Sequence, residues 1–136
     1  MQVTDISAKY EKAVTLISFP ADLVELFSRF KRRKKEHFFV ATLRADNKVI
    51  GLHVVALGSD DKTMVCPRSV FGVALLDGAV KIAVGHNHPT GNPDPSEPDK
   101  HITRKLREAG EILDISVIDH IIVCPDGSYY SFEENR

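Results

Sequence analysis

Apolar positions recur along the chain with two periods, which predicts both helices and strands. Residues 19–35 predict an amphipathic helix that opens at Pro20, with apolar side chains at helical spacing: Leu23, Leu26, Phe27 and Phe30. Two apolar runs then fill residues 36–58, separated by Asp46-Asn47, a pair typical of a β-hairpin turn. Both runs are apolar on consecutive positions, so we expect a sheet that is covered on both faces.

The middle of the chain continues with a helix and a strand. Residues 67–79 predict a second helix, which starts at Pro67 and ends near Gly78. The short apolar run 80–85 predicts a central strand that leads directly into a segment rich in histidine and proline.

The last part of the chain predicts a helix followed by a hairpin. Residues 96–113 predict the third helix, with four side chains facing inward: Ile102, Leu106, Ala109 and Leu113. Residues 116–124 and 128–132 predict two strands joined by a Pro-Asp-Gly turn. The whole order of elements predicts an α/β fold, with a mixed sheet sandwiched between helices.

The composition indicates one ordinary globular domain. The chain has 136 residues, 43% of them hydrophobic and 27% charged, and this length buries roughly two thirds of the unfolded surface. No apolar run approaches the roughly 20 residues of a membrane helix, and the first residues lack the pattern of a secretion signal. We therefore expect a cytoplasmic protein without a membrane partner, in which Cys66 and Cys124 are small buried residues rather than a disulfide.

The charge is concentrated in one place. A net charge of −1 gives no overall attraction to nucleic acid, although residues 31–35 read Lys-Arg-Arg-Lys-Lys. This run, called the basic segment below, fits the solvated end of the first helix, where cations are favoured by the helix dipole. It also fits a patch that binds phosphate or substrate, and both interpretations stay open.

Two histidines at the end of the central strand are candidate metal ligands. His86 and His88 flank one residue, so the alternation of a strand directs both imidazoles to the same side. Asp99 follows after a loop that contains prolines and Gly91, which can reverse the chain. Two histidines and one carboxylate with an open fourth position form the ligand set of catalytic zinc.

A purely structural interpretation competes for part of this segment. Ser96 and Asp99 have the spacing of a capping box, in which the serine caps a helix and the acid reaches back to it. The two roles are compatible, because the hydroxyl can cap the helix while the carboxylate faces the histidines. The contiguous letters His-Asn-His are not a nuclease signature, because in the nucleases named for these residues they are spread along the chain.

The complete segment resembles the JAMM signature of the JAB/MPN metalloprotease superfamily. It contains His86-Asn87-His88-Pro89, six further residues, and then Ser96-Glu97-Pro98-Asp99. Asn87 in place of serine or threonine is similar to the bacterial RadC branch, as are other stretches between about residues 36 and 133. The resemblance implies a single RadC-like JAB domain with the MPN fold, of the cytidine-deaminase-like kind. We expect its core over about 20–133, an N-terminal extension over 1–19 and no helix-hairpin-helix module.

The resemblance also implies roles for individual residues. His86, His88 and Asp99 would bind Zn²⁺, and Glu36 would be the upstream glutamate that accepts a proton from the water and passes it to the leaving amine. Ser96 would hydrogen-bond the oxyanion or the water. Glu97 is the rival for the role of Glu36, and an ion pair with a lysine is the alternative for Glu36 itself.

The four remaining histidines carry less weight. For Asp119-His120 we weigh a contact behind the metal ligands against a structural hydrogen-bonded pair, and we favour the structural role. The other histidines are expected to be surface or core residues: His37, His53 and His101.

Three functions compete at this stage. The first is a zinc-dependent peptidase or isopeptidase acting on a peptide or isopeptide-linked protein. The second is a nucleic-acid-associated protein of DNA repair or recombination, as the RadC resemblance and the basic segment suggest. The third is a scaffold without turnover, against which the intact motif argues. A free sheet edge would also allow a homodimer or the capture of an extended peptide.

Overall fold

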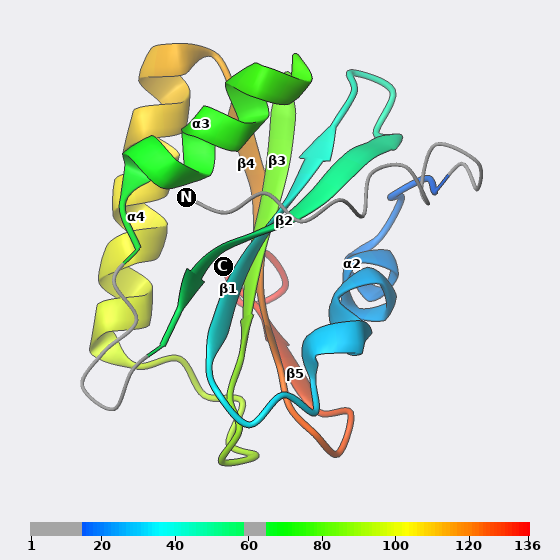
Figure 1. The fold of residues 1–136 in the computed structure, drawn as a ribbon, viewed down its shortest axis with the longest axis vertical. Helices are drawn as coiled ribbons and strands as arrows, with labels where there is room; N and C mark the ends of the chain where they lie inside the picture. Colours follow the sequence, from blue (N-terminus) through cyan, green and yellow to red (C-terminus); the bar gives the residue numbers. More distant parts are fainter. Residues whose placement is uncertain (1–14, 59–64) are drawn as a thin grey trace.

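A five-stranded mixed sheet runs through the molecule, with helices on both faces (Figure 1). The computed structural model describes residues 15–58 and 65–136. The strand order is β2-β1-β3-β4-β5, in which β3 and β4 are parallel and the other neighbours are antiparallel. The strands are β1 (His37–Leu43), β2 (Val49–Leu57), β3 (Lys81–Asn87), β4 (Ser116–Val123) and β5 (Tyr129–Ser131). The helices are α2 (Pro20–Phe27), the 3₁₀ turn η1 (Ser28–Phe30), α3 (Pro67–Asp77) and α4 (Glu97–Leu113).

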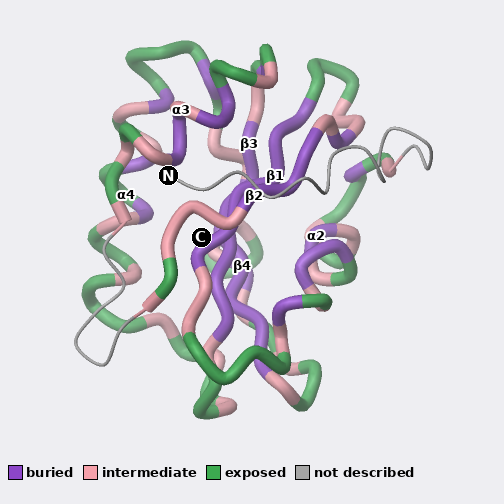
Figure 2. Tube along the Cα trace, viewed as in Figure 1, coloured by how far each residue is buried: buried purple, intermediate pink, exposed green. Residues whose placement is uncertain are grey.

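The alternation of side chains along the strands divides the core into two layers. On one face Phe39 of β1 packs with Phe27 of α2, and on the other face Val84 of β3 packs with Leu106 of α4. Helices α3 and α4 together cover this second face, while α2 covers the first (Figure 1). The strands between them are largely buried (Figure 2). The predicted α/β fold with a sheet between helices is therefore confirmed.

The face that a residue occupies on β3 decides its surroundings near the strand end. Gly85 faces α2, and a Cβ at this position would lie 2.5 Å from the ring of Phe39 and 2.8 Å from the ring of Phe27. Only glycine lets these rings pack against the backbone. His86 is directed to the opposite face, toward α4. The close packing of the two rings against Gly85 therefore fixes the position of the β3 backbone next to His86.

Three details differ from the expectations. The first helix ends before the basic segment, because α2 and η1 stop at Phe30 and residues 31–35 form turns. Leu113 is exposed rather than inward, because α4 reverses at Asp114 with φ 57° and Ile115 takes the buried position. Cys66 is exposed at the start of α3, whereas Cys124 is buried as expected, and both are free thiols.

The described segments also bear on the chain ends and on membranes. Of the expected N-terminal extension, residues 1–14 lie outside the described residues, whereas Ile17 is buried in the α2 layer. Within residues 15–58 and 65–136, no helix combines the length and apolar character needed to cross a membrane.

Candidate metal centre

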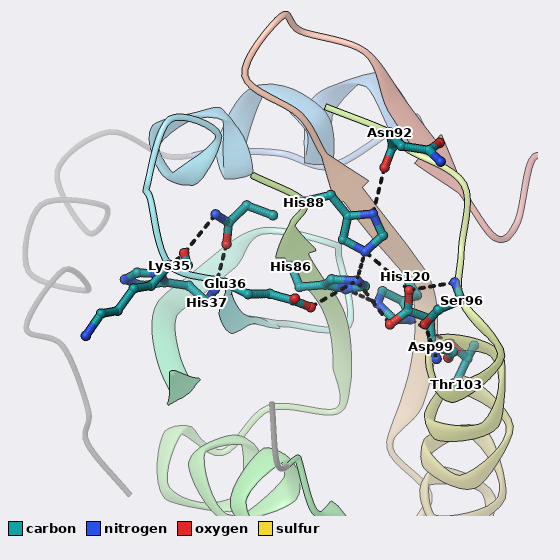
Figure 3. Close-up of polar contacts among 11 residues, drawn as sticks. Lys35, Glu36, His37, His86, His88, Asn92, Ser96, Asp99, Thr103 and His120 are labelled. Carbon is teal, nitrogen blue, oxygen red and sulfur yellow. Dashed lines mark hydrogen bonds and ion pairs between the residues drawn. The ribbon is translucent and has the colours of Figure 1, made fainter. Parts of the chain in front are cut away.

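The end of β3 brings the two predicted histidine ligands together. His86 is buried and His88 is half-buried, and their Nε2 atoms lie 2.9 Å apart (Figure 3). The N–H of His88 donates to the carbonyl of Val123 on β4, at 2.9 Å. The sheet ladder thus continues one residue past the strand and fixes the second histidine beside the first.

Asp99 reaches the same point from the first turn of α4. Its Oδ1 lies 3.3 Å from Nε2 of His86, and its Oδ2 lies 3.3 Å from Nε2 of His88. The capping box is present as well, because Asp99 N–H donates to Ser96 Oγ and Ser96 N–H donates to Asp99 Oδ2. The cap and the carboxylate contacts therefore coexist, and the cap determines how the carboxylate enters the site.

Glu36 approaches from the other side, just before β1. Its Oε1 lies 3.7 Å from Nε2 of His86, and its side chain is 36% exposed. One ligand atom from each of four residues lies within 4.8 Å of all the others, and these residues are Glu36, His86, His88 and Asp99. Glu97, the rival glutamate, is 84% exposed and faces Lys100 instead.

The charged groups of this cluster stabilise one another. Burial alone would raise the pKa of Asp99, but the polar contacts of its carboxylate with the imidazoles of His86 and His88 hold that pKa well below its usual range. Burial alone would lower the pKa of His88, but the hydrogen bonds to Asp99 and to the Asn92 carbonyl raise it above 6.5. The cluster is thus electrostatically suited to a bound positive charge.

The orientation of His88 tests whether the residues fit a zinc ion. Its Nδ1 lies 2.8 Å from the carbonyl oxygen of Asn92, which can only accept a hydrogen bond. In neutral His88 the proton is therefore on Nδ1, and the lone pair of Nε2 points to the cluster. Imidazole nitrogens with a carboxylate oxygen are ligands that zinc prefers, so the donor set fits the metal.

Asn87 has a structural role that its place in the motif does not indicate. Its Nδ2 donates to the carbonyls of Arg33 and Lys35, at 3.1 and 3.0 Å, and its Oδ1 accepts from the N–H of His37, at 2.6 Å. The buried amide thereby fastens the backbone on both sides of Glu36 to β3. In the sequence, Asn87 indicated only the resemblance to the RadC branch. Nothing in the sequence indicated its hydrogen-bond partners.

His120 contacts both Asp119 and the candidate ligand His86. The favoured hydrogen-bonded pair with Asp119 is present, because the N–H of His120 donates to Asp119 Oδ1 at 2.7 Å. In addition, Nε2 of His120 lies 2.8 Å from Nδ1 of His86, behind the candidate ligands. Asp119 faces the other side of the sheet, where Ser131 Oγ donates to it. Complete burial lowers the pKa of His120 well below 6.5, which keeps the ring neutral. The alternation of side chains along a strand could have indicated this arrangement, because it places the neighbouring residues Asp119 and His120 on opposite faces of the sheet.

A parallel pair of strands joined across α4, with a metal-ligand cluster at the end of the first strand, defines an α/β protein with a candidate metal centre. The model of the RadC-like JAB domain family matches residues 17–136, and the chain belongs to this family.

Three relatives are named UPF0758 proteins. One from Geotalea uraniireducens is 43% identical over 114 residues, which cover 83% of this chain and 50% of the relative. One from Pelobacter propionicus is 46% identical over 101 residues, which cover 74% of this chain and 44% of the relative. One from Methanococcoides burtonii is 42% identical over 109 residues, which cover 80% of this chain and 47% of the relative. The chain thus spans about half the length of these relatives.

Proposed function

We propose that the protein is a zinc-dependent hydrolase that cleaves amide bonds in a peptide or an isopeptide-linked protein. The observation that carries this proposal is the convergence of four side chains at the end of β3: Glu36, His86, His88 and Asp99. Three of them form the ligand set of an open zinc site, and the fourth is a carboxylate at its rim. Membership of the RadC-like JAB family is compatible with hydrolysis.

The chain's own residues divide the chemistry among them. Zinc bound to His86, His88 and Asp99 would supply the Lewis acidity that lowers the pKa of water to about 7. Glu36, beside the cluster but partly open to solvent, is suited to accept a proton and deliver it to a leaving amine. Ser96 Oγ accepts from Asp99 N–H, which leaves its own proton for a hydrogen bond to the oxyanion.

A zinc measurement and a substrate screen test the proposal. The purified protein should bind about one zinc per chain, and a panel of peptide and isopeptide substrates should reveal turnover. Glu36→Gln should abolish turnover while zinc remains bound. Glu97→Gln is the matched control, since this exposed side chain lies outside the cluster, and it should keep full activity. A zinc-loaded wild type that cleaves no member of the panel would favour a scaffold without turnover.

Nucleic-acid association is a second candidate function, supported by the position of the basic segment. Four of its five residues are exposed, and Asn87 fastens its backbone beside Glu36. Within the described part of the chain none of the five is in an ion pair with an acid, so their charges are available to phosphates. Replacing Lys31, Arg32, Lys34 and Lys35 by glutamate should abolish DNA binding and its salt dependence. Unchanged binding would remove this candidate.

A further inference from the structure

A chain of buried hydrogen bonds runs behind His86, away from the open side of the cluster (Figure 3). Nδ1 of His86 lies 2.8 Å from Nε2 of His120, and Nδ1 of His120 lies 2.6 Å from Oγ1 of Thr103. The hydroxyl of Thr103 donates in turn to the backbone carbonyl of Asp99, at 2.7 Å. The side chains of His86, His120 and Thr103 are all buried, so water does not compete for their hydrogen bonds.

The direction of every proton in this chain follows from its last member. A carbonyl oxygen can only accept, so the single hydroxyl proton of Thr103 points to Asp99. The Thr103 oxygen must therefore accept from Nδ1–H of His120. A neutral imidazole carries one proton, which leaves Nε2 of His120 as an acceptor. That nitrogen accepts from Nδ1–H of His86, and the Nε2 of His86 keeps its lone pair toward the cluster.

We propose that Thr103 and His120 are positioning residues, which hold His86 in the tautomer that can bind a metal ion through Nε2. The proposal rests on the proposed function only in naming zinc as that ion. The reverse direction would put the proton on Nε2 of His86, where it blocks ligation. It would also leave the Thr103 and Asp99 oxygens 2.7 Å apart with no proton between them.

The same chain of hydrogen bonds connects two ligands. It starts at the imidazole of His86 on β3 and ends at the backbone carbonyl of Asp99, whose carboxylate faces the cluster. His120 on β4 is the bridge between the strand and the helix. A change in Thr103 therefore acts on His86 through the proton arrangement, although Thr103 lies outside the four-residue cluster itself.

Paired substitutions at Thr103 test the proposal through zinc affinity. Thr103→Val keeps the shape but removes the hydroxyl, which frees His120 to adopt the other tautomer. We expect zinc affinity to fall about 10-fold, the lower end of the range for groups behind a metal ligand. Thr103→Ser keeps the hydroxyl and should keep wild-type affinity. The measurement is competition for zinc with a chromophoric chelator.

Thr42→Val is the matched control for the loss of a buried threonine hydroxyl. Thr42 is also fully buried, and its hydroxyl donates to Asp77 rather than to the metal centre. This variant should lose stability but keep zinc affinity. Equal zinc affinities for Thr103→Val and Thr103→Ser would overturn the proposal.

The tautomers themselves can be read in the zinc-free protein. Nitrogen-15 NMR of the imidazoles should show the proton of His86 on Nδ1, and the proton of His120 on Nδ1 as well. In Thr103→Val the His86 signal should shift toward the Nε2–H form. A wild-type His86 protonated on Nε2 would overturn the proposal. Because this experiment uses no zinc, a failure of zinc binding would contradict the proposed function without deciding the tautomers.

Discussion

Two buried groups of histidine, threonine and aspartate lie toward opposite ends of the same sheet face. At the end of β3, His86 and His120 connect to Thr103 and to the backbone of Asp99. At the far end, Nε2 of His53 lies 2.6 Å from Oδ2 of Asp77, and Thr42 Oγ1 donates to the same oxygen at 2.7 Å. The two groups use the same residue types, yet among the described residues only the first forms a cluster that could hold a metal ion.

The difference lies in where the lone pairs are directed. In the group around His53, one carboxylate oxygen of Asp77 is shared between the imidazole and the hydroxyl of Thr42. Within the described residues, His53 Nδ1 is buried without a hydrogen-bond partner, and no second histidine joins the group. This group ties β1 and β2 to α3. At the other end, hydrogen bonds behind the rings leave Nε2 of His86 and His88 facing one point. Convergence, rather than composition, makes the candidate site.

Removal of a ligand should give the largest effect and separate the two groups. His88→Ala and Asp99→Ala should each weaken zinc binding by more than the roughly 10- to 100-fold that loss of an outer partner costs. His53→Ala, at the far end, should leave zinc affinity unchanged. The measurement is metal content after dialysis, followed by competition titration. Zinc lost equally from all three variants would mean that the two groups are not independent.

The next effect concerns stability rather than metal. Asp77→Ala should lower the free energy of unfolding by about 1–3 kcal/mol, because the buried Nε2 of His53 loses its partner and the hydroxyl of Thr42 keeps only its longer hydrogen bond to the Gly51 carbonyl. Asp77→Asn keeps an acceptor and should cost less. Urea denaturation of the zinc-free proteins measures both values. An Asp77→Ala variant as stable as wild type would show that this group does not tie α3 to the sheet.

The smallest effect is a pH dependence that belongs to the metal cluster alone. The pKa of His88 is raised above 6.5, and a proton on its Nε2 excludes a metal ion. Zinc affinity should therefore fall as the pH drops through this raised pKa, by at most about tenfold per pH unit for one proton.

The zinc-free protein should respond in the opposite direction. Because the folded-state pKa of His88 lies above its unfolded value, its contribution to stability is complete below about pH 6.5 and is lost as the pH rises through the folded pKa. Urea denaturation and zinc titration between about pH 5.5 and 8 measure both trends. Identical pH profiles for wild type and His88→Ala would contradict the assignment.

Local patterns were enough to predict most of the fold and the convergence of the candidate ligands, while the binding of a metal by these residues stays a prediction. Strand alternation placed His86 and His88 on one side, and the capping-box spacing placed Asp99 on the first helical turn. Both are short-range rules, in which a few neighbouring residues decide the geometry. The helices and strands were predicted for the same reason. The prediction that Leu113 faces inward was wrong, because the end of the helix depends on the reversal at Asp114 and on which residue then reaches the core.

The partners behind the ligands could not be predicted, because they depend on register between distant strands. The hydrogen bonds of Asn87 to Arg33 and Lys35 need the pairing of β1 with β3. The contact of His120 with His86 needs the register of β4 beside β3. Periodicity in one segment carries no information about such offsets, so the candidate ligands could be proposed from the sequence while the residues that hydrogen-bond behind them could not.

The parallel pairing of β3 with β4 has a kinetic consequence. His86 and Asp99 lie on either side of the loop before α4, but the whole crossover helix separates both of them from His120 along the chain. Glu36 arrives from β1, still earlier in the chain. Contacts between segments so far apart in sequence form late, since closing the intervening chain costs entropy. A metal ion bound to the finished cluster would therefore slow unfolding and leave the folding rate nearly unchanged.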